Sequence, residues 1–213
     1  MYPVSYEADF RSEQNRATTF FRIILAIPWL IVAYVYEIAA FFTLIFAWVA
    51  IVITGRYPEG LYKLNAGFVR YYVRTYAWAF LQTDEWPPFG IGDDPHYPIR
   101  VNVAPRAERQ SRLSAFFRLI LAIPMLIVSY AVGYMHLMAG VIAWLTIVFR
   151  GYLPEQLNTA MTFCNGFYAR TYGYLALLTD DYPPIGAERA KGLGNYPAAA
   201  SPEPPMPPVA PSV

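Results

Sequence analysis

The chain has 213 residues, of which 56% are hydrophobic and only 15% are charged. Soluble domains carry roughly 25% charged residues, so this composition argues against an ordinary soluble globular protein. A formal net charge of +1 excludes a strongly basic protein that binds nucleic acid, and the single cysteine, Cys164, excludes an intrachain disulfide.

The chain consists of two similar halves. The segment 20–32 returns as the segment 116–128 with 11 of 13 residues identical, at an offset of 96 residues. The offset then continues without a gap to the double proline that closes each half. We therefore predict two tandem repeats, residues 1–92 and 93–188, followed by a disordered proline-rich tail at 189–213.

Each repeat opens with a short stretch of alternating apolar residues, at Tyr2–Ala8 and Tyr97–Val103. Alternation with a period of two predicts a β-strand. Two such strands, one from each repeat, can pair with each other on the cytoplasmic face.

A long apolar block of 34 residues follows in each repeat. One helix of that length would extend about 51 Å, whereas the hydrocarbon core of a bilayer is about 30 Å thick. We therefore predict bends near 34–37 and 130–136, which divide the blocks into transmembrane hairpins at 17–54 and 113–150. Each arm would hold about 17 residues, the lower limit for a crossing, so hairpin wedges that do not cross fully remain the alternative.

Each apolar block contains one proline and one arginine at equivalent positions of the two repeats. Pro28 and Pro124 lie inside the first arms, where a proline removes a backbone donor and kinks the helix. Arg22 and Arg118 stand near the start of each block, where a guanidinium can reach the interface and bind a lipid phosphate or the carboxylate of a partner. A plain interfacial anchor is the alternative.

Glycine and proline then end each block and favour a further helix, which we place at 58–82 and 154–178. The first copy is amphipathic with a basic stripe, which is typical of a helix lying in the membrane interface. Attraction to anionic lipid is one interpretation, and packing onto the helical bundle is the other. The basic positions are Lys63, Arg70 and Arg74 in the first copy and Arg170 in the second.

All 16 Lys and Arg residues lie outside the two predicted bends. The positive-inside rule then places both termini in the cytoplasm of a multi-pass protein of the cell (inner) membrane. Because both repeats begin and end on one side, we expect a pseudo-twofold axis along the membrane normal. The fold class is thus an all-α integral membrane bundle of two hairpins, each with an interfacial amphipathic helix.

Several motifs together resemble those of a known family. They are the order Arg-x-x-x-Phe-Phe-Arg-x-Ile-Leu-Ala-Ile-Pro from Arg16, the pairs Ala47-Trp48 and Ala143-Trp144, the segment 54–61, and the Thr-Asp-x-x-Pro-Pro ending. The chain resembles two tandem copies of DUF4389, a family of bacterial membrane proteins without an assigned function. This resemblance implies a topology and no mechanism.

No residue pattern predicts catalysis, a cofactor or a metal. The histidines, His96 and His136, lack metal-ligand spacing, and neither a phosphate loop nor a nucleophile motif is present. We expect a non-catalytic accessory or scaffold subunit of a membrane protein complex, whose partners are membrane lipids and other membrane subunits. The alternatives are a membrane-shaping hairpin protein and a lipid-binding or lipid-transfer component. A proton-handling or metal pair of Glu37 with His136 is a minor hypothesis.

Overall fold

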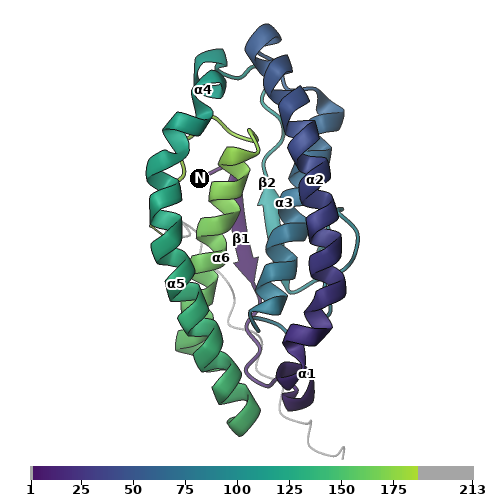
Figure 1. Cartoon of the computed structure of the whole chain (residues 1–213), viewed down its shortest axis with the longest axis vertical. Coiled ribbons are helices and arrows are strands. Elements are labelled where there is room, and N and C mark those ends of the chain that lie inside the picture. Colours follow the sequence, from purple (N-terminus) through teal and green to yellow (C-terminus); the bar gives the residue numbers. More distant parts are fainter. Residues whose placement is uncertain (1, 187–213) are drawn as a thin grey trace, which may run out of the picture.

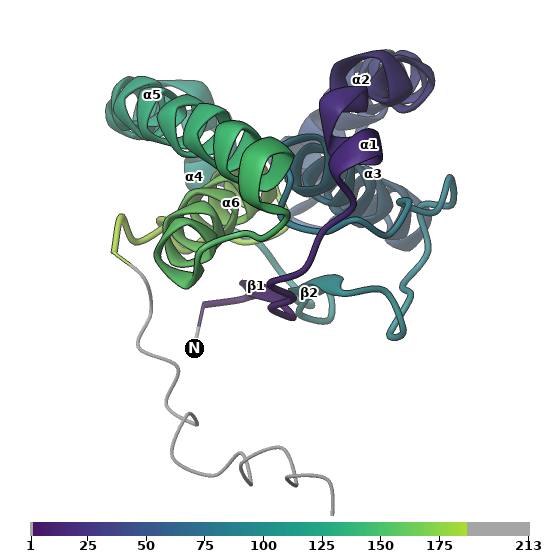
Figure 2. The same cartoon turned by 90° about the horizontal axis from the view of Figure 1, so that it is seen from below.

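The computed structural model describes residues 2–186, so the predicted tail at 189–213 lies outside the described residues. The described part is mostly helical and forms three layers (Figures 1 and 2). Its elements are β1 (Val4–Ala8), α1 (Arg16–Phe20), α2 (Arg22–Thr54), α3 (Glu59–Ala79), β2 (Ile99–Val103), α4 (Arg112–Phe116), α5 (Arg118–Arg150) and α6 (Glu155–Leu175). The long helices α2 and α5 form one outer layer, α3 and α6 the middle layer, and the strands the opposite outer layer (Figure 2).

The predicted bends are wrong, because α2 and α5 are each one continuous helix of 33 residues. The segment 34–37 contains no glycine or proline that would break a helix, and it packs along α3 instead. Buried Ala26, Ala33 and Ala47 are spaced by multiples of seven residues, so they lie on one face and let α3 approach closely. The helical hairpin of each repeat is therefore made by α2 with α3, or α5 with α6, and not by two arms of the apolar block.

Local sequence signals set the ends of these helices. Gly55 and Gly151 adopt left-handed backbone conformations with φ of 70° and 82° directly after α2 and α5, which explains why glycine is found there. Asn15 and Ser111 cap the short helices α1 and α4 through their side chains. Pro28 and Pro124 lie inside α2 and α5 without ending them, and a kink at either position stays a prediction.

The predicted strand pair is confirmed. Strands β1 and β2 form an antiparallel ribbon in which Tyr6 pairs with Val101 at the centre. The ribbon packs on the face of α3 and α6 that is turned away from the long helices (Figure 2). The helices predicted at 58–82 and 154–178 are also present, as α3 and α6.

The two repeats pack side by side in opposite directions, so the start of each repeat contacts the end of the other's long helix. The Trp48 indole N–H donates to the Ala115 carbonyl at 3.0 Å, and the Phe20 ring lies 5.9 Å from the Trp144 ring at the other end. Helices α2 and α5 consequently run antiparallel, and the pseudo-twofold axis is perpendicular to them (Figure 1). This arrangement differs from the expected bundle of two hairpins with a common direction.

Candidate functional site: an apolar face and the cavity behind it

The outer layer made by α2 and α5 is covered with exposed apolar side chains. Ile23 is 79% exposed and Leu119 is 76% exposed, and most large apolar residues on both helices are exposed in the same way. Both helices are long and apolar enough to cross a membrane. In the most apolar window of α2 only 11% of the residues are buried, so the fold itself leaves this surface uncovered. We call the exposed side of α2 and α5 the apolar face.

The opposite layer is polar. On the β-ribbon, the Arg100 guanidinium donates to both Asp9 carboxylate oxygens at 2.7 and 2.8 Å, and it lies 3.5 Å from Glu7. The hydrogen bond from Arg100 holds the pKa of Asp9 below its ordinary value. The molecule is therefore a slab with one apolar and one charged side.

Arginines stand at both ends of the apolar face. Arg56, Arg109 and Arg112 line a polar hollow at the end of α2, and Arg16 with Arg150 lines the equivalent hollow at the end of α5. Among the described residues, none of these five makes an ion pair. We call them the rim arginines. Their charge is available to an external anion.

The expected lipid contact of Arg22 and Arg118 needs correction, because these side chains are only 2% and 3% exposed. Arg22 pairs with Asp84 and lies over the Trp78 ring at 4.5 Å. Arg118 repeats the arrangement with Asp180 at 2.9 Å and the Tyr174 ring at 4.1 Å. Because both side chains are buried, their role is structural. Each arginine links the C-terminal segment of its repeat to the start of the long helix.

The arginines of the predicted basic stripe face the inside of the protein, whereas Lys63 is exposed. Arg74 is 1% exposed and donates to the Ile99 and Gly92 carbonyls, while Arg70 donates to the Val101 carbonyl. Burial lowers the pKa of Arg74 from its ordinary value. Arg170 is likewise buried and donates to the Gly186 carbonyl at 3.3 Å. The expected lipid contacts of Arg74 and Arg170 are corrected accordingly, because both side chains are buried. Lys63 is exposed and pairs with Glu59, and Arg70 is half-buried, so their lipid contacts stay predictions.

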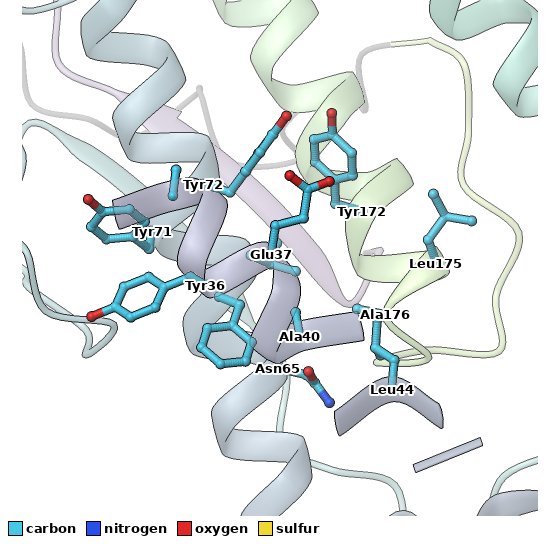
Figure 3. Close-up of a pocket in the computed structure, with 13 residues that line it drawn as sticks. Tyr36, Glu37, Ala40, Leu44, Asn65, Tyr71, Tyr72, Tyr172, Leu175 and Ala176 are labelled. Carbon is cyan, nitrogen blue, oxygen red and sulfur yellow. The ribbon is translucent and has the colours of Figure 1, made fainter. Parts of the chain in front are cut away.

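A cavity lies behind the apolar face, between α2, α3 and α6 (Figure 3). Its volume is about 220 Å³, and its wall is largely apolar and aromatic. The Glu37 carboxylate lies beside the side chains of Tyr72 and Tyr172 (Figure 3). Within residues 2–186 it is the only carboxylate that lines the cavity, and no lysine, arginine or histidine of this range lines it. Glu37 forms no ion pair with any described residue.

A second cavity of about 160 Å³ adjoins the first and shares Tyr72 and Tyr172 with it. It occupies the pseudo-symmetric place against α5 and is lined by His136, which is 4% exposed. The imidazole stacks on the Phe80 ring at 4.1 Å, and its Nε2 is buried without a hydrogen-bond partner in the described structure. We refer to the two hollows together as the central cavity.

The repeats differ at the positions that line this cavity. Glu37 of α2 corresponds to Gly133 of α5, and Ala40 corresponds to His136, by the offset of 96 residues. A side chain at Gly133 would stand 2.9 Å from the Tyr168 hydroxyl, so the second hollow has no room for a counterpart of Glu37. The two hollows therefore share a tyrosine floor but carry different polar groups.

Four tyrosines form the floor, in two equivalent pairs. The Tyr72 ring stacks on Tyr76 at 4.3 Å and meets Tyr172 edge-on at 4.9 Å, while Tyr168 stacks on Tyr172 at 5.8 Å. Burial is the main cause that raises the pKa of Tyr172 to about 12, and it raises the pKa of Tyr72 as well. The floor thus offers neutral hydroxyls and aromatic rings at physiological pH.

Comparison with known proteins now places the chain in a family. The model of the family described as Domain of unknown function (DUF4389) matches residues 16–90 and again residues 112–186. These matches cover well over half of the chain, which belongs to the DUF4389 family as two tandem copies. No curated protein and no solved structure matches it.

Arg22, Arg118 and Glu37 are recognisable from the sequence as notable residues. For Arg22 and Arg118, however, the sequence predicts contact with a lipid phosphate or a partner's carboxylate. The structure pairs Arg22 with Asp84 and Arg118 with Asp180, which are acidic residues at the end of the same repeat. The tyrosine floor was missed. Its signal was present in the repeat, since Tyr72 and Tyr76 return as Tyr168 and Tyr172. Among the described residues, no three metal-ligating side chains come together, and Glu37 and His136 line adjoining hollows.

Proposed function

We propose that this protein is a non-catalytic membrane protein that lies in one leaflet, with its apolar face in the hydrocarbon and its ribbon in water. The observation that carries the proposal is the separation of the two kinds of surface: exposed apolar side chains gather on α2 and α5, and the charged ribbon lies on the far side (Figure 2). A contiguous apolar surface of this kind marks a membrane or protein contact.

The shape of the slab favours an in-plane position over a crossing. A straight helix of 33 residues extends about 50 Å, so it would have to tilt strongly to match about 30 Å of hydrocarbon. The ribbon lies beside the middle of α2 and α5 (Figure 1), so in a crossing protein Glu7, Asp9 and Arg100 would sit at the depth of the bilayer centre. Charged groups are expensive there. Lying flat removes both costs.

The rim arginines fit the same position. In the plane of the membrane they all lie at one headgroup level, at both ends of the slab. Each basic residue close to an anionic surface contributes about 1 kcal/mol of attraction. The pseudo-twofold axis then runs along the membrane normal, and the basic residues lie on one side of the membrane as the positive-inside rule requires.

The biological role that suits this geometry is an accessory or scaffold subunit. The apolar face holds the protein on the membrane, and the ribbon face presents charged groups to partner subunits. Membrane shaping is the second candidate, because two long helices inserted into one leaflet add area to that leaflet alone. If the protein shapes membranes, we expect it to bind preferentially to small, highly curved vesicles.

Flotation with liposomes tests the proposal. The wild-type chain should float with vesicles that contain anionic lipid, and the double variant Ile24→Glu/Ile120→Glu, at equivalent sites that are both 62% exposed, should stay at the bottom of the gradient. Asn102→Glu on the exposed ribbon is the matched control and should float like the wild type. Flotation that is unchanged by the double substitution contradicts the in-plane position. A wild-type chain that forms a soluble dimer and does not float contradicts the membrane location itself.

A further inference from the structure

We propose that the central cavity binds the alkylammonium headgroup of a zwitterionic phospholipid. This inference rests on the proposed function, since it treats the cavity as open to the leaflet that covers the apolar face.

The first argument is the charge of the cavity. Glu37 belongs to the middle of α2, whose exposed side is otherwise apolar, and no described Lys, Arg or His pairs with it. The Glu37 side chain is exposed, so in the proposed in-plane position its carboxylate faces the leaflet, where a charge needs an opposite charge or a full set of hydrogen bonds. No lysine or arginine in the described part of the chain lines either hollow, so an anionic headgroup finds no countercharge from these residues.

The second argument is the aromatic wall. Five rings line the first hollow, and they belong to Tyr36, Phe68, Tyr71, Tyr72 and Tyr172. Aromatic faces attract ammonium groups, and cages of such rings are the usual binding sites of alkylated ammonium ligands. A carboxylate within an aromatic cage is selective for a cation over a neutral polar group.

The third argument is the unpartnered imidazole. His136 Nε2 is buried in the adjoining hollow without a hydrogen bond among the described residues, and Tyr168 and Asn165 line the same space. A buried polar atom without a partner is costly, and a ligand hydroxyl, phosphate or water in this hollow would supply the bond. Neither Glu37 nor His136 has an identical residue at the equivalent position of the other repeat, so the polar groups of the cavity are not a by-product of duplication.

The lining of the first hollow also suits the upper part of a lipid. Apart from Asn65, the remaining lining is apolar, with Ala33, Ala40, Leu44 and Leu175 beside the aromatic rings. A volume of about 220 Å³ exceeds the space of several waters, each of which takes about 30 Å³, and it accommodates a small headgroup but not acyl chains. The chains would lie along α2 on the apolar face. A phospholipid therefore satisfies both the cavity and its surroundings.

The test uses the full chain in detergent micelles, where binding to the cavity does not depend on insertion into a bilayer. Titration calorimetry compares three probes: dihexanoyl phosphatidylethanolamine, dihexanoyl phosphatidylglycerol with the same tails and an anionic headgroup, and free ethanolamine. We expect the first to bind at least tenfold more tightly than either of the others. Glu37→Gln should weaken it at least tenfold, whereas Glu155→Gln, an exposed control on α6, should leave it unchanged.

Equal binding of the two short-chain lipids overturns the inference, and so does wild-type affinity in Glu37→Gln. Free ethanolamine that binds as tightly as the lipid shows a soluble alkylammonium ligand and overturns the lipid assignment. Circular dichroism and the thermal midpoint of Glu37→Gln establish that the variant is folded, and Tyr72→Phe provides a second variant that keeps the ring and the cavity shape. These titrations need no bilayer. A wild-type chain that does not float with liposomes but still binds dihexanoyl phosphatidylethanolamine therefore refutes the proposed function and leaves this inference standing.

Discussion

The buried ion pair of each repeat gives the sharpest prediction about stability. Replacing Asp84 with Asn keeps the size of the side chain but removes the negative charge that faces Arg22. The Asp84 carboxylate also accepts hydrogen bonds from the Asn15 backbone N–H and the Thr18 hydroxyl. An amide presents one oxygen and one NH₂ to these three donors, so at least one donor loses its acceptor.

The magnitude follows from the burial of Arg22. Removing one partner of a buried ion pair costs about 3–5 kcal/mol, because the remaining charge stays desolvated. Arg22 is 2% exposed, but the Asp84 side chain is 27% exposed and water can reach that side of the pair. We therefore expect a loss of about 3 kcal/mol in the free energy of unfolding, the lower end of that range. For a chain of this length that loss lowers the thermal midpoint by about 6–12 °C.

Thermal unfolding in detergent, followed by circular dichroism at 222 nm, measures the effect. Asp180→Asn should lower the midpoint to a similar extent, because Arg118 is buried in the same way. Glu59→Gln is the matched control: it removes the acidic partner of Lys63 in an exposed pair and should leave the midpoint unchanged. If Asp84→Asn unfolds at the wild-type temperature, the interpretation of the Arg22 pair as a structural clasp is wrong.

Three further predictions follow from particular contacts. Because burial raises the pKa of Tyr172 to about 12, its neutral form stabilises the fold below pH 10, and this contribution is lost as pH rises from 10 through 12. Absorbance at 295 nm should therefore show tyrosines that ionise late and together with unfolding. Ionisation of all tyrosines near pH 10 contradicts this prediction. Gly173→Ala places a methyl group 2.6 Å from Val4 Cγ2 and should destabilise the chain by about 1–3 kcal/mol. In the control Gly60→Ala the added methyl group meets no atom within 4 Å and should not destabilise the chain. Equal free energies of unfolding for the two variants in chemical denaturation refute the close packing of β1 on α6. Replacing Arg56 and Arg112 with Gln should weaken binding to anionic vesicles several-fold at low salt and little at high salt, and a salt-independent loss excludes an electrostatic role of the rim.

Much of the architecture was predictable from the repeat, and the errors have physical causes. The strands at the start of each repeat, the helix ends at Gly55 and Gly151, and the second helix of each unit follow from local patterns that act over a few residues. The bend at 34–37 was predicted from a length argument that assumes a crossing normal to the membrane. A helix that lies in the plane has no such limit on length.

The candidate site was harder to predict, because it depends on how the repeats meet. Arg22 has the sequence context of an interfacial anchor, and only the return of the chain after α3 brings Asp84 to it. The central cavity is formed where α3 of one repeat contacts α6 of the other, so no pattern within one repeat predicts it. Glu37 and His136 were recognised as unusual residues in apolar segments, but each hollow is completed by side chains from the other half of the chain, such as Tyr172 in the first hollow and Phe80 in the second.

The orientation of α2 in the membrane tests the account most directly. Single cysteines can replace Ser12 and Glu59, exposed residues before and after this helix, in a Cys164→Ala background. An impermeant maleimide is then applied to one side of sealed vesicles of uniform orientation. An in-plane helix predicts that both cysteines react from the same side and neither reacts from the other. Reaction of the two cysteines from opposite sides shows that α2 crosses the bilayer and contradicts the proposed position.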